Sequence, residues 1–172
     1  MRRTAVCIAV LVTACQSASP ASSASPASPA SPTLLEVNAT MVHIVDGDTI
    51  DVTVRGHHER VRLIGIDTPE TKKPNTPVQC YGPEATKFTS SLLPVDTPLH
   101  LDRDVVARDD YGRLLAYVYL AGDGTFVNLE VIQQGFARPL TIAPNTAHAG
   151  EFVDAARAAQ AAHIGLWAQC TG

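Results

Sequence analysis

Two carboxylates, Asp46 and Asp48, stand on either side of a glycine at the end of the strand-like run VHIVDGDTI. An Asp-Gly pair between apolar runs is a strong signal for a tight hairpin turn, because both residues tolerate a positive φ. Two carboxylates separated by one residue also suit a hard cation, which prefers oxygen ligands. The segment alone is therefore compatible with a structural turn and with a metal site.

The segment RLIGIDTPE adds further oxygen-bearing side chains at the end of a predicted strand. Arg62 lies on that strand, and Asp67 lies at its end. Because Pro69 disfavours the helical conformation for the residue before it, Thr68 is expected to be extended, with its carbonyl able to face a ligand. Glu70 follows, where a carboxylate can act as a general base.

The segment DYGRLLAYVYL begins another predicted strand with Arg113. Arg62 and Arg113 carry planar guanidinium groups that match the oxygens of a phosphate. Taken singly, each arginine fits an ordinary surface ion pair, and Glu70 fits a solvated loop carboxylate. Taken together, the carboxylates and arginines predict a metal-assisted site for phosphate chemistry.

Hydrophobic periodicity predicts the elements that position these residues. Ile50, Val52 and Val54 share one face of a strand. Pro83 stands at a first helical position, and Gly135 stands where a helix would stop. The predicted strands cover approximately residues 35–45, 49–55, 59–66, 98–106 and 112–120, and the predicted helices cover 83–93, the segment FVNLEVIQQG and 147–164. This order of short elements predicts an α+β fold, a small antiparallel barrel with helices packed on it.

The first residues have the pattern of an export signal. Arg2 and Arg3 precede an apolar run, residues 5–12, that is too short to span a bilayer as a helix. The segment LVTAC resembles the lipobox of bacterial lipoproteins, in which the cysteine, here Cys15, is acylated and becomes the mature N-terminus. We expect a signal peptide over residues 1–14; the alternative is an ordinary secretory signal in which Cys15 has no role.

Composition divides the remaining chain into a tether and one domain. Residues 15–33 consist almost entirely of Ser, Ala and Pro, and such a segment buries too little apolar surface to fold. Residues 34–172 are long enough for one compact domain with its own core. Removing Arg2 and Arg3 with the signal leaves 11 of the 13 basic residues against 17 acidic ones. The overall field of such a domain does not attract a polyanion, so local cations must bind any nucleic acid.

The order of six segments resembles that of the staphylococcal nuclease, or thermonuclease, family. These segments are DGDT, RLIGIDTPE, YGPEA, DYGRLLAYVY, VNLEVIQQGFA and the PNT at residues 144–146. They extend over essentially all of residues 34–172. The resemblance implies an OB-fold, a five-stranded antiparallel barrel with three α-helices. It also implies a calcium-dependent endonuclease that cleaves DNA and RNA to 3′-phosphates.

The resemblance assigns a role to each of the singled-out residues. The implied Ca²⁺ ligands are Asp48, Asp67 and the Thr68 carbonyl, and the implied catalytic residues are Arg62, Glu70 and Arg113. Asp46 is expected to support the turn rather than to bind the metal. Glu70 would act as a general base or would position the attacking water, and the sequence does not separate these roles. Both arginines would stabilise charge on the phosphate while the cation takes another oxygen.

Two departures from the family pattern bear on substrate binding. Asp110 stands where the best-known member has a lysine that helps to hold a phosphate. That member has tyrosines that pack on the nucleotide where this sequence has Leu140, Thr141 and Ile142. Stacking contributes about 1 to 3 kcal/mol per base, so we expect weaker substrate binding. Tyr111 and Tyr81 remain as substrate-binding candidates.

The cysteine count predicts one disulfide bond. Cys7 leaves with the signal and Cys15 carries lipid, so the exported domain keeps Cys80 and Cys170 in a compartment where disulfides persist. The alternative is two free buried thiols. No cysteine–histidine spacing indicates a zinc site, and the pair His57-His58 is expected at an exposed hairpin tip.

The leading hypothesis is an exported calcium-dependent nuclease, monomeric and held by lipid at the extracytoplasmic face of the cell membrane. Its expected substrates are DNA and RNA, with single strands preferred. One alternative is a non-catalytic nucleic-acid-binding OB-fold lipoprotein, because this barrel also serves as a binding platform. Another is a structural or adhesion lipoprotein, which would explain the tether but not the motifs.

Replacing the predicted acylation site, in Cys15→Ala, is expected to move the protein from the membrane fraction to the soluble fraction. The reason is that stable membrane attachment by lipid needs the acyl chains that this cysteine would carry. Fractionation of cells that express the wild type and the variant is the measurement. A variant that stays in the membrane fraction would show that the lipobox interpretation is wrong.

Overall fold

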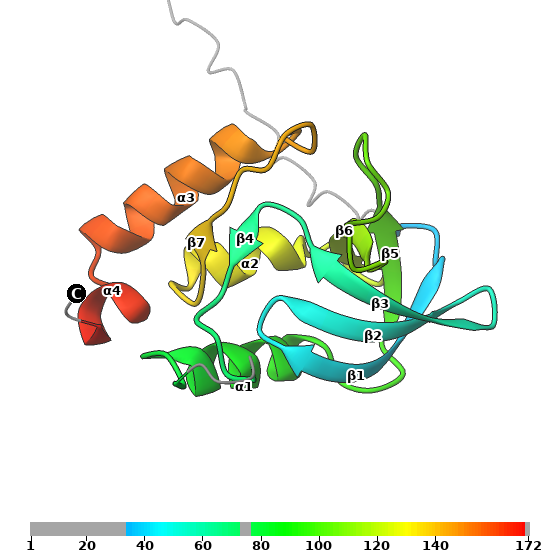
Figure 1. Ribbon diagram of the computed structural model, residues 1–172, viewed down its shortest axis with the longest axis horizontal. Helices are drawn as coiled ribbons and strands as arrows, with labels where there is room; N and C mark the ends of the chain where they lie inside the picture. Colours follow the sequence, from blue (N-terminus) through cyan, green and yellow to red (C-terminus); the bar gives the residue numbers. More distant parts are fainter. Residues whose placement is uncertain (1–33, 73–76, 171–172) are drawn as a thin grey trace, which may run out of the picture. The chain divides into compact units, whose positions relative to one another are not determined.

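The computed structural model describes residues 34–72 and 77–170 (Figure 1). The predicted signal peptide and tether, including Cys15, lie outside the described residues. Within the described ranges, no helix has the length and apolar character needed to cross a membrane.

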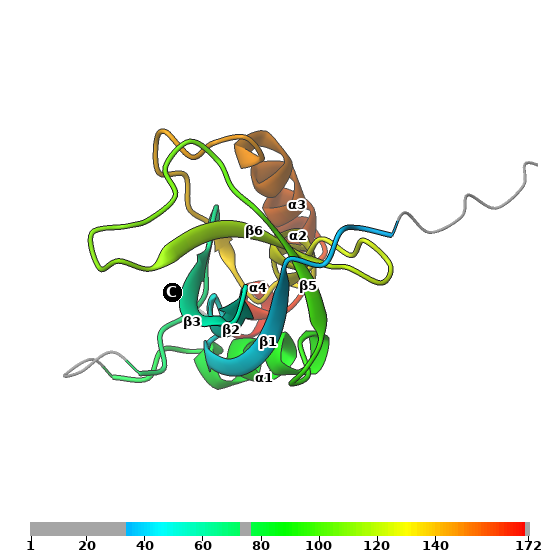
Figure 2. The ribbon, with the colours of Figure 1, turned by 90° about the vertical axis from the view of Figure 1, so that its right-hand side faces the viewer.

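Five strands form a closed barrel in the order β1-β2-β3-β6-β5. They are β1 (Ala39–Asp46), β2 (Thr49–Val54), β3 (His57–Leu63), β5 (Pro98–Asp102) and β6 (Leu114–Leu120). Figure 2 shows these strands arranged around the barrel interior. Two short strands, β4 (Ile66–Asp67) and β7 (Arg138–Pro139), pair beside the barrel. The predicted α+β fold with a five-stranded barrel is confirmed.

One pairing in the barrel is parallel, so the expectation of a wholly antiparallel barrel is wrong at this point. β3 and β6 run in the same direction, with Val61 opposite Leu114 and Leu63 opposite Ala116. The chain between them contains helix α1 (Gly82–Leu92) and strand β5. A connection of that length lets the chain return before it pairs, which a tight hairpin does not allow.

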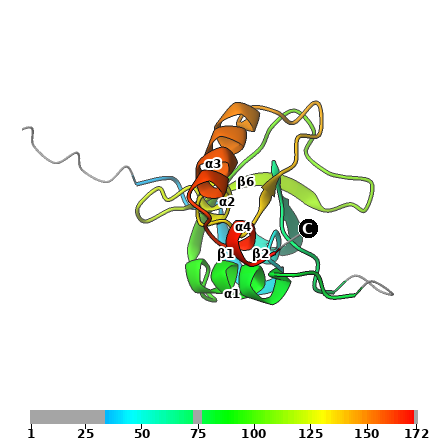
Figure 3. The ribbon, with the colours of Figure 1, turned by 90° about the vertical axis from the view of Figure 1, so that its left-hand side faces the viewer.

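Helices cover one side of the barrel. α1 packs against β1, while α2 (Val127–Gln133) packs against β6 and against α3 (Ala149–Ala161). A one-turn helix, α4 (Leu166–Gln169), follows α3 (Figure 3). The three predicted helices are therefore present, and Pro83 stands in the first turn of α1 as expected. Gly135 follows α2 with a φ of 72° and lies in close contact with the backbone at Ile164.

The ends of two strands differ from the prediction. β1 begins at Ala39 rather than at residue 35, because the preceding residues make only isolated pairings, such as the Asn38 N–H with the Leu99 carbonyl. β5 ends at Asp102 rather than at residue 106. There the Asp102 carboxylate accepts a hydrogen bond from the next main-chain N–H, a local contact that competes with strand pairing.

The barrel interior is apolar, and one buried amide ties it to α2. Ile50 and Val52 are fully buried and Val54 packs against the core, as the alternation predicted. Asn128 of α2 accepts a hydrogen bond from the Val118 N–H at 2.9 Å and donates one to the Ile64 carbonyl at 2.8 Å. This side chain therefore pairs main-chain groups of two segments, which a buried polar group must do to avoid a penalty.

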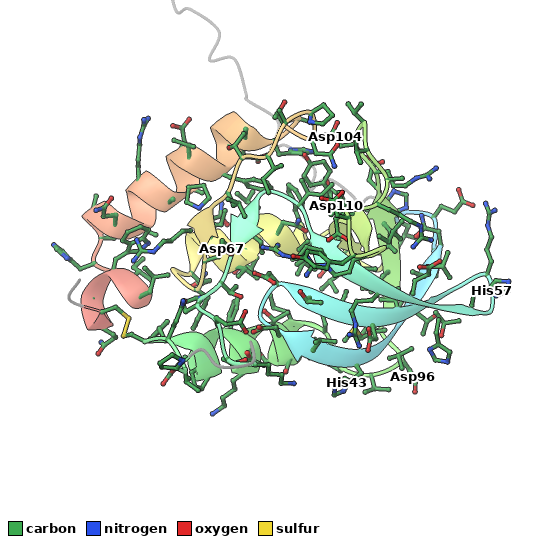
Figure 4. The ribbon with its side chains drawn as sticks, viewed as in Figure 1. His43, His57, Asp67, Asp96, Asp104 and Asp110 are labelled. Atoms are coloured by element: carbon green, nitrogen blue, oxygen red, sulfur yellow. A yellow bond between two sulfur atoms is a disulfide. The ribbon has the colours of Figure 1, made fainter. Side chains whose placement is uncertain are left out.

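A disulfide bond joins Cys80 to Cys170, as the cysteine count predicted. Cys80 lies shortly before α1, and Cys170 follows α4, so the bond fastens the segment after α4 to the segment before α1 (Figure 4). Its two Cα atoms lie 5.9 Å apart and are separated by 90 residues in the sequence.

Removing this bond, in the double variant Cys80→Ser/Cys170→Ser, is expected to lower the free energy of unfolding by about 2 to 4 kcal/mol. The reason is that closing so long a loop restricts the unfolded chain. Urea unfolding of the oxidised wild type and the variant measures the difference, and the reduced wild type is the control. Equal stability of the oxidised wild type and the variant would contradict the prediction.

Candidate active site

One open cleft of about 760 Å³ collects the residues that the sequence singled out. The segments that form it are the β1–β2 turn, β3, β4 with the following loop, and the turn before β6. The predicted site residues in its lining are Asp46, Asp48, Arg62, Asp67, Thr68, Glu70, Tyr111 and Arg113. Figure 4 shows Asp67 at the end of β4 and Asp110 in the loop before β6. Segments far apart in the sequence thus bring carboxylates and guanidinium groups to one place.

Asp48 is the most constrained of these residues. It is buried, and its Oδ2 accepts hydrogen bonds from the Thr68 main-chain N–H at 2.9 Å and from the Thr68 hydroxyl at 3.1 Å. Its Oδ1 accepts one from the Thr49 hydroxyl at 3.0 Å. Arg62 Nη2 lies 3.2 Å from Oδ2. A buried carboxylate needs this many partners to offset the loss of water.

The glycine between the two carboxylates allows Thr68 to approach. A Cβ atom on Gly47 would lie 2.8 Å from the Thr68 hydroxyl oxygen, which is closer than real Cβ contacts allow. The β1–β2 turn is present as predicted, but Gly47 does not have a positive φ. The turn interpretation of DGDT is therefore confirmed, with the glycine required by close packing rather than by a positive φ.

Arg62 lies between two carboxylates. Its Nη2 is 3.2 Å from Asp48 and 3.5 Å from Asp67, and its Nη1 donates a hydrogen bond to the Leu63 carbonyl. Only 13% of the Arg62 side chain is exposed, against 59% for Asp67. Arg62 is therefore held in one orientation, while Asp67 faces the solvent-filled part of the cleft.

Burial, together with the negative charge of the cleft, raises the pKa of two carboxyl groups, those of Asp67 and Asp46. Burial raises the pKa of Asp67, and the neighbouring charges of Asp48 and Glu70 raise it further against the effect of Arg62. Burial also raises the pKa of Asp46, opposed by the Gly47 N–H and supported by Glu70 and Asp48. A cation in the cleft would offset this repulsion.

Glu70 is held by the main chain that follows it. Its Oε1 accepts hydrogen bonds from the Thr71 N–H at 2.9 Å and from the Lys72 N–H at 2.7 Å. Its own N–H donates to Gln79 Oε1 at 3.0 Å. These bonds fix the carboxylate at the edge of the cleft, beside Asp46.

Arg113 is oriented by a turn that the motif DDYGR forms. Asp109 Oδ2 accepts a hydrogen bond from Arg113 Nε at 2.7 Å, and Asp109 Oδ1 accepts one from the Arg113 N–H at 2.9 Å. Tyr111 lies beside the guanidinium group, whose carbon is 5.4 Å from the ring centroid. Arg108 fastens the turn to β3, because it donates to Glu59 at 2.7 and 2.8 Å and to the Gly112 carbonyl at 2.9 Å.

Asp109 and Arg108 are positioning residues that the sequence analysis missed. An aspartate whose carboxylate accepts from the N–H two residues later is typical of a turn, and Asp109 does so with Tyr111 at 3.0 Å. The motif DDYGR therefore contains a local signal for the turn that Asp109 forms. The pairing of Arg108 with Glu59 joins residues 49 positions apart and has no local signal.

The two tyrosine candidates differ in their placement. Tyr111 is 86% exposed and lines the cleft, so its ring is available to a base. Tyr81 precedes α1, and its ring stacks on Phe136 with the centroids 5.3 Å apart. It does not line the cleft. The structure therefore gives no support to the prediction that Tyr81 contacts a substrate there.

The residues that depart from the family pattern lie beside the cleft. Asp110, Leu140 and Ile142 line a neighbouring hollow of about 470 Å³, which also touches Arg62 and Arg113. Leu140 and Ile142 are 36% and 63% exposed, so they offer aliphatic rather than aromatic contact. The exposed Thr141 lies between them.

The histidines lie apart from the cleft carboxylates or have other partners. His57 and His58 are exposed at the start of β3, and Figure 4 shows His57 at the hairpin tip, far from Asp67. In the part of the chain that the structure describes, no three His, Cys, Asp or Glu side chains form a metal-binding group.

Comparisons with known proteins agree with these geometric features. Residues 60–169 match the family described as staphylococcal nuclease homologue. The chain is 44% identical over 124 residues to a thermonuclease of Staphylococcus intermedius, which covers 72% of each chain. It is 39% identical over 127 residues to a thermonuclease of Staphylococcus hyicus, covering 74% of this chain and 73% of that relative. It is 40% identical over 135 residues to the endonuclease YncB of Bacillus subtilis, covering 77% of this chain and 63% of that relative.

Neutralising one crowded carboxylate, in Asp67→Asn, is expected to stabilise the metal-free protein at pH 7 by about 0.5 kcal/mol, the scale of partly exposed charge interactions. The raised pKa means that the charge of Asp67 opposes folding above that pKa. The gain should vanish as the pH falls below the ordinary value of 3.8, where the wild-type group is protonated in both states.

Thermal unfolding with a chelator present, at neutral and acidic pH, measures this difference. Asp154→Asn on α3 is the matched control, because the Asp154 side chain is 78% exposed and faces only Arg157 at 3.4 Å. A loss of stability at pH 7 in Asp67→Asn would show that its contact with Arg62 outweighs the repulsion.

Proposed function

The chain belongs to the staphylococcal nuclease family, and we propose that it is a calcium-dependent endonuclease that hydrolyses DNA and RNA to products with 3′-phosphate ends. The family and the relatives identify a nuclease, an enzyme that hydrolyses phosphodiesters. The proposal adds the metal, the substrates, the products and the location.

The oxygen donors of the cleft fit a hard cation. Asp48 and Asp67 would supply carboxylate oxygens and Thr68 its main-chain carbonyl, all of them ligand types that Ca²⁺ prefers. Since the described side chains include no grouped set of three metal ligands, water and substrate oxygens would complete the coordination. The raised pKa of Asp67 supports this fit, because burial and then the charges of Asp48 and Glu70 disfavour its ionised form, a penalty that a cation would offset.

Bound calcium would supply a Lewis acid for one phosphate oxygen. Arg62 and Arg113 would bind the other phosphate oxygens through their planar guanidinium groups. Asp48 and Asp109 hold these arginines in place before the substrate arrives. Preorganised charge of this kind lowers the energy of the transition state without reorganisation at the moment of reaction.

Glu70 would take the proton of the attacking water or would orient that water. Either role requires a carboxylate in a fixed position, and the N–H groups of Thr71 and Lys72 provide it. Glu70 lines the same cleft as the two arginines.

The observation that carries the proposal is the convergence of Asp48, Arg62, Glu70 and Arg113 on one cleft. A non-catalytic binding module has no use for carboxylates beside phosphate-binding arginines, because they repel the ligand. The relatives that are named thermonuclease and endonuclease favour the catalytic interpretation in the same way.

Single-stranded DNA and RNA are the proposed substrates. Both arginines would contact the phosphate, which the two nucleic acids share. The exposed ring of Tyr111 offers a stacking surface that only an unpaired base can use. The lipobox-like LVTAC segment supports a lipid anchor at Cys15 on the extracytoplasmic face of the membrane.

Cleavage of single-stranded DNA is expected to require calcium and to fall by about 100-fold or more in Asp67→Asn, because one carboxylate ligand is lost. Gel assays with calcium, and with chelator, measure the rate. End-group analysis with a phosphatase identifies the products.

Calcium should also raise the unfolding temperature of the wild type and not that of Asp67→Asn, because a ligand that binds only the folded state stabilises it. Undiminished turnover with excess chelator would contradict the metal requirement. Products with 5′-phosphate ends would contradict the proposed cleavage position.

A further inference from the structure

A second hollow of about 450 Å³ opens beside the cleft, between the outer surface of β2 and β3 and the turn before β6. Arg60, Tyr111 and Arg113 line both the hollow and the cleft, so the two are continuous. The remaining lining consists of Val42, Asp51, His58, Glu59 and Gly112. We call this hollow the β3 groove.

The register of β2 and β3 places basic side chains at alternate positions of β3, of which His58 and Arg60 line this groove and Arg62 lines the cleft. Arg62, Arg60 and His58 alternate along β3 and stand opposite Thr49, Asp51 and Thr53 of β2, respectively. Alternate residues of a strand share a face and are about 6.6 Å apart. This is also the scale of the spacing between adjacent phosphates in an extended nucleic-acid strand. A strand with one phosphate at Arg62 therefore has its neighbouring phosphate near Arg60.

Arg60 is placed so that a phosphate can compete with its present partner, Asp51. Its Nε and Nη2 donate to the Asp51 carboxylate at 2.8 and 3.0 Å, and 54% of its side chain is exposed. The pair with Asp51 is bidentate and so stronger than a typical surface ion pair, but more than half of the Arg60 side chain is exposed, so a phosphate can reach the guanidinium group and compete with Asp51. The hydrogen bond from Arg60 is the main cause of the lowered pKa of Asp51, and the smaller effects of His43 and His58 would remain if a phosphate displaced Asp51.

The nearest other carboxylate does not oppose a phosphate in the groove. Glu59 precedes Arg60, but both of its oxygens accept hydrogen bonds from Arg108. Its side chain is 24% exposed, which leaves it less accessible than Arg60. Arg60 and Arg113 are therefore the guanidinium groups that line the groove, and Arg60 is the one that lies on β3.

We propose that the β3 groove is a phosphate subsite, in which Arg60 binds the phosphate next to the one held in the cleft. Nucleic-acid strands longer than a dinucleotide would leave the cleft past Tyr111 and lie along β3. The inference rests on the proposed function, because it extends the same substrate beyond the cleft.

The test compares wild type with Arg60→Ala on a single-stranded dinucleotide and on an octanucleotide of the same base. We expect kcat/KM on the octanucleotide to fall by about fivefold more than on the dinucleotide, because only the longer strand has a phosphate to place in the groove. Arg60→Lys should restore part of this difference, since it keeps the charge. Arg157→Ala, which removes an exposed arginine paired with Asp154 on α3, should change neither value.

Binding measured by fluorescence anisotropy in chelator separates the failure of the groove from the failure of the proposed function. We expect the salt dependence of octanucleotide binding to weaken by about 0.7 in log–log slope in Arg60→Ala, the value for one phosphate contact on a single strand. Equal losses on both lengths, or no loss on either, would overturn the subsite. If calcium does not support cleavage by the wild type, the proposed function fails, while the anisotropy result still decides the subsite.

Discussion

The site depends on the hydrogen bonds and the ion pair that the Asp48 carboxylate makes. A buried carboxylate is stable only when donors replace its water, and here Thr49, Thr68 and Arg62 provide them. The main-chain carbonyl of Asp48 also accepts from the Leu63 N–H at 2.9 Å. One residue thus joins the β1–β2 turn to β3 and to the start of the loop after β4. The remaining cleft residues are placed relative to this junction.

This junction concentrates negative charge where folding alone would avoid it. Asp46, Asp67 and Glu70 lie near Asp48, and the pKa values of Asp46 and Asp67 are raised mainly by burial and further by Asp48 and Glu70. A sequence selected only for stability would replace one of these carboxylates. The proposed cation would offset this cluster at the mouth of the cleft, so the carboxylates that lower stability would serve the proposed function.

Local signals predicted most of the elements and most of the site. Alternation placed Ile50 in the core, and Pro83 marked the start of α1. The motifs identified the cleft residues, because each motif stands beside the end of a strand. The parallel pairing of β3 with β6 and the role of Asn128 were not predictable in this way. Both depend on contacts between distant segments, and a lone asparagine in a helix has no signal that it will be buried.

The arrangement of arginines explains how an acidic domain can act on a polyanion. Four arginines near the cleft each have a carboxylate partner: Arg60 with Asp51, Arg62 with Asp48, Arg108 with Glu59 and Arg113 with Asp109. Each pair cancels most of its long-range field, so the domain does not attract nucleic acid strongly from a distance. The same pairs fix the guanidinium groups in direction, and fixed groups act where charge develops during reaction. Such a site favours turnover over tight retention of substrate and product.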